Sequence, residues 1–169
     1  MSDTAYTWCA IPVRCIRRHH HPTIVTAFRL TRKNLLLVLK QRPKRHPAGF
    51  DNSTQVRFVA GCPCLVHEHD DLLGGGIDLE DLLREAQIPY LRTNAPAATF
   101  PATATVHPGT GDSVTIWCTP DCQDPLVRVT WQQGHLAFDA EDLAQVDTYH
   151  RERAQLLNPA PRERVVGRP

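Results

Sequence analysis

The chain has 169 residues, of which 41% are hydrophobic and 22% are charged. This composition is typical of a globular protein, and a chain of this length buries roughly two-thirds of its unfolded surface without needing disulfides. No apolar run approaches the roughly 20 residues of a membrane-spanning helix, so we expect no membrane segment. The first residues lack the basic start and apolar stretch of a signal peptide, which predicts a cytoplasmic location.

The net charge of +1 conceals an uneven distribution of charge along the chain. Residues 1–50 contain ten lysines or arginines and one acidic residue, whereas residues 51–150 contain fifteen acidic and four basic residues. A basic segment of this size is typical of a surface that contacts DNA or RNA. Two alternatives are that the basic segment packs on the acidic part of its own chain, or that it is an ordinary solvated face.

Arginine supplies sixteen of the nineteen cations, and its guanidinium binds phosphate through two parallel hydrogen bonds. An excess of arginine, alanine and proline is also what a GC-rich bacterial or phage genome produces. The residues predicted to contact phosphate are Arg14, Arg17, Arg18, Arg32, Lys33, Lys40, Arg42, Lys44 and Arg45.

Short runs with period-2 alternation or β-branched residues predict strands. The predicted strands are residues 24–30, 55–60, 113–118 and 126–131. Residues 35–39 are ambiguous, since they either form a strand that pairs with residues 24–30 in a hairpin or begin a helix. The polar residues between the two segments favour the hairpin.

Two helices are predicted to begin at aspartates, because an Asp side chain at the N-cap accepts hydrogen bonds from free backbone N–H groups. The first runs from Asp78 to residue 87 and is stopped by Pro89, and the second runs from Asp139 to about residue 157. The two helix starts resemble each other in sequence. An internal duplication is one interpretation, and the shared physics of capped helices is the other.

These elements predict an α+β fold with short antiparallel strands and two Asp-capped helices, with two similar strand-plus-helix halves if the duplication is real. The predicted organisation is a basic arm, strand-rich unit and first helix over residues 1–91, a Pro/Ala/Thr linker over 92–103, a second strand-rich unit with the C-terminal helix over 104–157, and a mobile tail over 158–169.

Cysteine and histidine are concentrated in residues 62–69, where thiolate and imidazole place four potential zinc ligands within eight positions. The gaps between these ligands do not match the two-residue spacing of common zinc modules, so a composite site is predicted. Free buried thiols and disulfides are the alternatives. The candidate zinc ligands are Cys62, Cys64, His67, His69, Cys118 and Cys122.

The sequence contains no Gly-x-Ser-x-Gly elbow, no phosphate-binding loop and no complete catalytic metal motif. We therefore expect a small non-enzymatic regulatory or accessory protein that contacts nucleic acid through its basic N-terminal third and is stabilised by zinc. One alternative is a protein-interaction module, such as a phage-encoded inhibitor or a virion component. The second alternative is a metal-dependent hydrolase that uses the Cys/His cluster. The sequence does not predict the oligomeric state.

Overall fold

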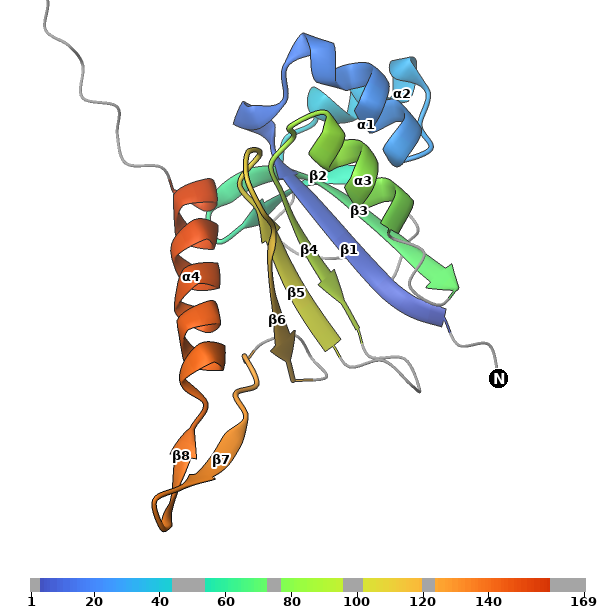
Figure 1. The fold of residues 1–169 in the computed structure, drawn as a ribbon. Coiled ribbons are helices and arrows are strands. Elements are labelled where there is room, and N and C mark those ends of the chain that lie inside the picture. The colour runs from blue at the N-terminus through green and yellow to red at the C-terminus, as the bar shows by residue number, and fades with distance from the viewer. Residues whose placement is uncertain (1–3, 44–53, 73–76, 96–101, 120–123, 159–169) are drawn as a thin grey trace, which may run out of the picture.

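An antiparallel sheet of six strands forms the centre of the fold, in the order β2-β3-β1-β4-β5-β6 (Figure 1). The first strand of the chain, β1, pairs with β3 on one side and with β4 on the other. Its interior position requires apolar residues on both faces, and Cys9, Ala10 and Ile11 are all fully buried. The computed structural model describes residues 4–43, 54–72, 77–95, 102–119 and 124–158. The strands are β1 Thr4–Pro12, β2 Thr54–Val59, β3 Cys62–Leu72, β4 Tyr90–Asn94, β5 Ala102–His107 and β6 Val114–Cys118.

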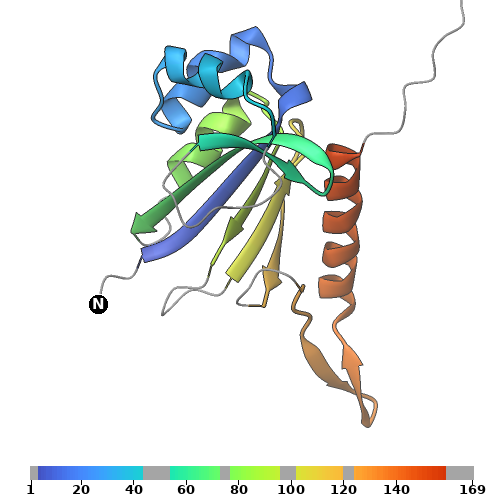
Figure 2. The same ribbon diagram turned by 180° about the vertical axis from the view of Figure 1, so that it is seen from behind.

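Helices pack on both faces of this sheet (Figures 1 and 2). Three short helices cover the face formed by β1 to β4, and one long helix packs against β5 and β6 on the other face. Two 3-10 turns, η1 Val13–Cys15 and η2 Arg18–His20, connect β1 to the first helix. The helices are α1 His21–Ala27, α2 Arg32–Leu39, α3 Ile77–Glu85 and α4 Ala140–Leu157.

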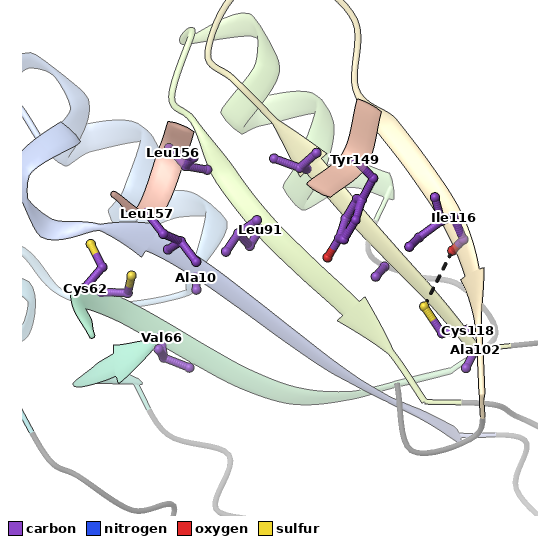
Figure 3. Packing of buried hydrophobic residues seen from close by; sticks show 13 residues of the cluster. Ala10, Cys62, Val66, Leu91, Ala102, Ile116, Cys118, Tyr149, Leu156 and Leu157 are labelled. Carbon is purple, nitrogen blue, oxygen red and sulfur yellow. Dashed lines mark hydrogen bonds between the residues drawn. The ribbon is translucent and has the colours of Figure 1, made fainter. Parts of the chain in front are cut away.

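The alternation of side chains along each strand divides the interior into two cores. In β1, Ala10 belongs to the core under α4, whereas its neighbours Cys9 and Ile11 belong to the core under α1, α2 and α3. Figure 3 shows the first of these cores, in which Tyr149 and Leu156 of α4 lie over the sheet. The sheet is therefore buried on both faces by different parts of the chain.

A separate hairpin of two strands, β7 Val129–Gln132 and β8 His135–Phe138, precedes α4. It extends past the end of the main sheet, away from α1 and α2 (Figures 1 and 2). Residues Gln133 and Gly134 close it, both with positive φ (49° and 84°), as a tight hairpin turn requires.

The predicted α+β class with antiparallel strands is confirmed. Strands predicted at 55–60 and 113–118 correspond to β2 and β6, and the helix predicted at 139–157 corresponds to α4. Asp139 caps α4 as expected, since its Oδ1 accepts hydrogen bonds from the backbone N–H groups of Glu141 and Asp142, both at 3.0 Å. Helix α3 begins at Ile77, and the side chain of Asp78 lies outside the described residues.

The prediction of a strand at residues 24–30 is wrong, because this segment forms α1 and the turn after it. Its β-branched residues favour a strand by local propensity. The helix instead places Ile24 and Phe28 four residues apart on one side, where both are buried. Pro22 in the first turn also suits a helix start, since its missing N–H has no partner there in any case.

The hairpin predicted for residues 35–39 is also wrong, and the alternative, a helix, is what the structure contains as α2. The hydroxyl of Thr31 accepts a hydrogen bond from the backbone N–H of Asn34 at 3.1 Å. The polar residues before Leu35 are therefore an N-cap and a first helical turn, and not a turn between two strands.

Strands β1, β3, β4, β5 and β8 were not predicted, and two of them, β4 and β5, overlap the expected linker over 92–103. β4 and β5 pair directly, so both predicted strand-rich units contribute to one sheet. Residues 96–101 of the expected linker and 159–169 of the expected tail lie outside the described part of the chain. Within the described residues, no helix has the length and apolar character needed to cross a membrane.

Candidate nucleic-acid interface

The N-terminal third folds into a helical layer with cations on its surface. We define the basic helical layer as residues 17–42, which comprise η2, α1, α2 and their connections. All of its lysines and arginines are exposed. In Figures 1 and 2 this layer forms the end of the molecule opposite the β7–β8 hairpin. The seven cations of the layer are Arg17, Arg18, Arg29, Arg32, Lys33, Lys40 and Arg42.

Local structure directs these cations outward. At the start of the layer, His20 is buried and its Nδ1 accepts a hydrogen bond from the backbone N–H of Arg17 at 3.1 Å. Burial, and then the neighbouring His19, lowers the pKa of His20, which favours the neutral ring needed for this contact. In α2, buried Leu35 anchors the helix, and the first turn carries its cations into solvent.

No carboxylate in the described residues pairs with any cation of the basic helical layer. Residues 4–50 contain no Asp or Glu, so the layer has no acidic partner close in sequence. The ion pairs that the structure describes involve arginines from later segments. These arginines are Arg57, Arg84, Arg92, Arg128 and Arg151.

Arg14, predicted to contact phosphate, lies at a different place. Its guanidinium donates hydrogen bonds to the carbonyls of Leu156 and Leu157 and to the sulfur of Cys62, the last two at 3.1 and 2.9 Å. These carbonyls belong to the last turn of α4 and have no partner within the helix. Arg14 therefore holds the end of α4 and does not belong to the basic helical layer. Lys44 and Arg45 lie outside the described residues.

The predicted zinc ligands do not come together as a set. Cys62 and Cys64 lie on the α4 side of β3, whereas the ring of His67 stacks on Phe28 on the other face, with 4.6 Å between ring centroids. Cys118 lies on β6 at the far edge of the sheet, with three strands between it and β3, and Figure 3 shows this separation from Cys62. The side chain of His69 and all of Cys122 lie outside the described part of the chain.

The cysteine near Cys62 and Cys64 is Cys15, from η1. Burial raises the pKa of both Cys15 and Cys64, and the neighbouring Cys62 raises them further. Thiols of this kind are protonated at neutral pH and are poor nucleophiles. The described residues contain no group of three or more potential ligands in a metal-binding arrangement. Zinc binding by Cys62 and Cys64 stays a prediction.

Four polar residues that were not predicted as site residues lie where α3, β4 and β5 meet: Tyr90, Arg92 and His107 are buried, and Glu80 is partly buried. Nη1 of Arg92 donates to Oε2 of Glu80 at 2.9 Å, and the rings of Tyr90 and His107 lie 5.3 Å apart between centroids. Three polar atoms of these residues have no hydrogen-bond partner among the described residues: Glu80 Oε1, Arg92 Nε and His107 Nε2.

This polar cluster has a defined charge state. Burial raises the pKa of Tyr90 and lowers the pKa of His107, so both rings are neutral at pH 7. Tyr90 and His107 are almost completely buried, so the cluster belongs to the interior and not to the surface. The available sequence signal was the alternation of Tyr90 and Arg92 around Leu91, which places the two polar side chains on one face of a strand.

No protein-family model matches this chain, and no curated protein or solved structure matches it either. The function proposed below therefore depends on the described residues alone.

Proposed function

We propose that this protein contacts nucleic acid through the basic helical layer and acts as a small regulatory or accessory protein without catalysis of its own. The observation that supports this proposal is the set of seven exposed cations with no carboxylate partner among the described residues. Like charges at this density repel one another. A phosphate backbone offsets that repulsion, and its neutralisation releases bound counterions.

The chemistry of the layer suits phosphate. Five of its seven cations are arginines, whose planar guanidinium matches two phosphate oxygens at once. The competing interpretation is that the layer is neutralised by the acidic part of the same chain. The described acidic residues that form ion pairs use other arginines, which supports an outward role for the layer.

The test is binding to labelled duplex DNA, single-stranded DNA and RNA, measured by fluorescence anisotropy over a range of salt. For duplex DNA, neutralising seven phosphates gives a slope of about −6 in a plot of log binding constant against log salt. The double variants R17Q/R18Q and R32Q/K33Q each remove two cations of the layer. Each is expected to reduce the magnitude of the slope by about 1.8.

The matched control is R84Q/R151Q, which also removes two exposed arginines. Each of these pairs with a carboxylate in the folded protein, Arg84 with Asp81 and Arg151 with Glu152, so the control leaves the unpaired cations intact. We expect its salt slope to equal that of the unmodified protein. The proposal fails if micromolar protein binds none of the three nucleic acids at low salt, or if the control loses as much affinity as the two layer variants.

A further inference from the structure

The β7–β8 hairpin exposes one apolar face. The cross-strand pairs Val129–Phe138 and Trp131–Leu136 lie on the same face of the hairpin, because side chains alternate along each strand. Trp131 is 71% exposed, and the other three are exposed by more than half. The opposite face carries the polar residues Thr130, Gln132 and His135. Apolar and polar side chains thus alternate along β7 and β8 as they do in a sheet with one buried face, but in this hairpin the apolar face is exposed to solvent.

The rest of the chain provides little support for this hairpin. Its base is attached by Arg128, whose guanidinium and backbone N–H bind the carboxylate of Asp142 on α4 at 2.8–2.9 Å. The backbone N–H of Asp139 also donates to the carbonyl of Arg128 at 2.9 Å. Beyond these contacts the strands pair with each other, and an isolated two-stranded hairpin is only marginally stable in water.

The side chains of the apolar face are of the types that dominate binding energy at protein interfaces. Trp and Phe supply large buried areas at low entropic cost, and alanine substitution of such residues commonly causes the largest losses of affinity. A contiguous exposed apolar patch on a soluble protein usually marks an interaction surface. At the base of the hairpin lies a cleft of about 540 Å³ that includes Trp117, Leu126 and Val127 in its lining.

The surroundings of this patch are acidic. Residues 124–147 contain five acidic residues and one basic residue, and that basic residue, Arg128, is bound to Asp142. Asp124, Glu141 and Asp147 are exposed and have no ion-pair partner among the described residues. Glu141 also lines the cleft. The patch therefore has an apolar centre and, at the base of the hairpin, an acidic rim of Asp139, Glu141 and Asp142, of which Glu141 and Asp142 line the cleft.

We propose that the apolar face of the β7–β8 hairpin, together with the cleft at its base, binds a cationic amphipathic segment of another protein. Apolar side chains of the segment pack on Trp131 and Phe138, and its lysines or arginines meet the acidic rim. A symmetric contact with a second copy of this chain opposes acid to acid, which disfavours it. The same negative charge disfavours nucleic acid at this end of the molecule.

The probe is a labelled helical peptide of about four turns, with leucines on one side and lysines on the other. A second peptide replaces every lysine with glutamate, and a third replaces every leucine with serine. Binding to the full chain is measured by fluorescence anisotropy. The leucine–lysine peptide is expected to bind at micromolar concentrations, and the other two are expected to bind at least about tenfold more weakly.

Two variants locate the contact. W131A/F138A removes the aromatic centre and is expected to weaken binding by at least about tenfold, whereas E141Q removes a rim charge that lines the cleft and reduces the salt dependence of binding. The side chains of Trp131, Phe138 and Glu141 are exposed, so neither variant affects the core. The matched control is L36A/L37A, which removes two exposed apolar residues of α2 and is expected to leave peptide binding unchanged.

Three results would overturn the proposal. One is equal binding of the leucine–lysine peptide to the unmodified chain and to W131A/F138A. The second is equal binding of the lysine and glutamate peptides. The third is self-association of the chain in analytical ultracentrifugation that disappears in W131A/F138A, since the occupant of the face is then a second copy. Whichever peptide result is obtained, W131A/F138A is expected to bind nucleic acid as the unmodified protein does, because the basic helical layer lies at the other end of the molecule (Figure 1).

Discussion

The guanidinium of Arg14 donates a hydrogen bond to the backbone carbonyl of Leu157 at 3.1 Å, across 143 positions of sequence. It also binds the carbonyl of Leu156, so one side chain satisfies two of the free acceptors at the end of α4. Contact with the sulfur of Cys62 at 2.9 Å fixes the same guanidinium to β3. The segment after β1, the beginning of β3 and the last helix are thus joined at one residue.

Arg14→Ala is expected to reduce the free energy of unfolding by about 1–3 kcal/mol, because charged hydrogen bonds to the last carbonyls of α4 are lost. Arg14→Lys is expected to lose less of the free energy of unfolding than Arg14→Ala, but it does not reach that of the unmodified protein, since an ammonium does not reproduce the forked donors of the guanidinium. Urea unfolding measures the free energy of both variants. Arg17→Ala, in an exposed residue nearby, is the control and should stay within about 0.5 kcal/mol of the unmodified protein.

A second prediction concerns Arg57 and Glu68, which form a bidentate ion pair that is buried on both sides. Arg57→Met is expected to destabilise the protein by about 3–5 kcal/mol, because Glu68 is left as an unpaired buried charge. The double variant R57M/E68L removes both charges and should recover much of that loss. A double-mutant cycle from urea unfolding measures the coupling. Additive effects of the two single changes would show that the pair does not act as a unit.

The contact between Arg128 and Asp142, which attaches the β7–β8 hairpin to α4, is expected to weaken at acidic pH. Hydrogen bonds from the side chain and backbone of Arg128 lower the pKa of Asp142 to about 2, below the ordinary value of 3.8. A carboxylate with a lowered pKa stabilises the folded arrangement above its ordinary pKa, and the contribution disappears as pH falls toward 2. The backbone amide signal of Arg128 in NMR spectra should therefore shift between pH 4 and pH 2. In Arg128→Gln the titration of Asp142 should move up toward its ordinary range.

The stability of the folded protein is also expected to depend on pH through a basic group of the polar cluster, His107. Burial lowers the pKa of His107 below the ordinary value of 6.5, so the folded state favours the neutral ring. The unfolded chain then binds more protons than the folded chain as pH falls below about 6.5, and stability decreases. Urea unfolding of the unmodified protein and of His107→Gln should show a difference that becomes smaller toward acid. A difference independent of pH would contradict this assignment.

The strands and helices that sequence patterns predicted correctly are those whose local and tertiary preferences agree. In α4, the Asp139 cap and the apolar residues at helical spacing indicate the same element that the sheet requires. In α1, the two disagree: Ile24 has a strand-like local preference, but burial of Ile24 and Phe28 on one side of a helix overrides it. The sequence carries signals for both elements, since Pro22 suits a helix start and the β-branched residues suit a strand, and packing against the sheet decides between them.

The candidate site was predicted in part. The charge pattern identified the basic segment, but which of its cations bind other parts of the fold depends on tertiary contacts. Arg14 and Arg17 are both exposed, yet the guanidinium of Arg14 binds carbonyls at the end of α4. The cysteines show the same limit, since Cys62 and Cys118 look equivalent in sequence but lie on β3 and on the edge strand β6, with three strands between them. The contact of Arg14 with α4 and the separation of Cys62 from Cys118 both depend on which segments lie close together in the fold, and this cannot be inferred from a single sequence.

The interior position of β1 has a consequence for how the chain is made. Thr7 of β1 donates a hydrogen bond to the side chain of Asn94 in β4, 87 positions later in the sequence. During synthesis, β1 leaves the ribosome first but remains without its second neighbour until β4 has also emerged. Its apolar residues and open backbone edges are exposed to other chains for that interval, and unpaired edges of this kind are the sites at which strands of different chains pair.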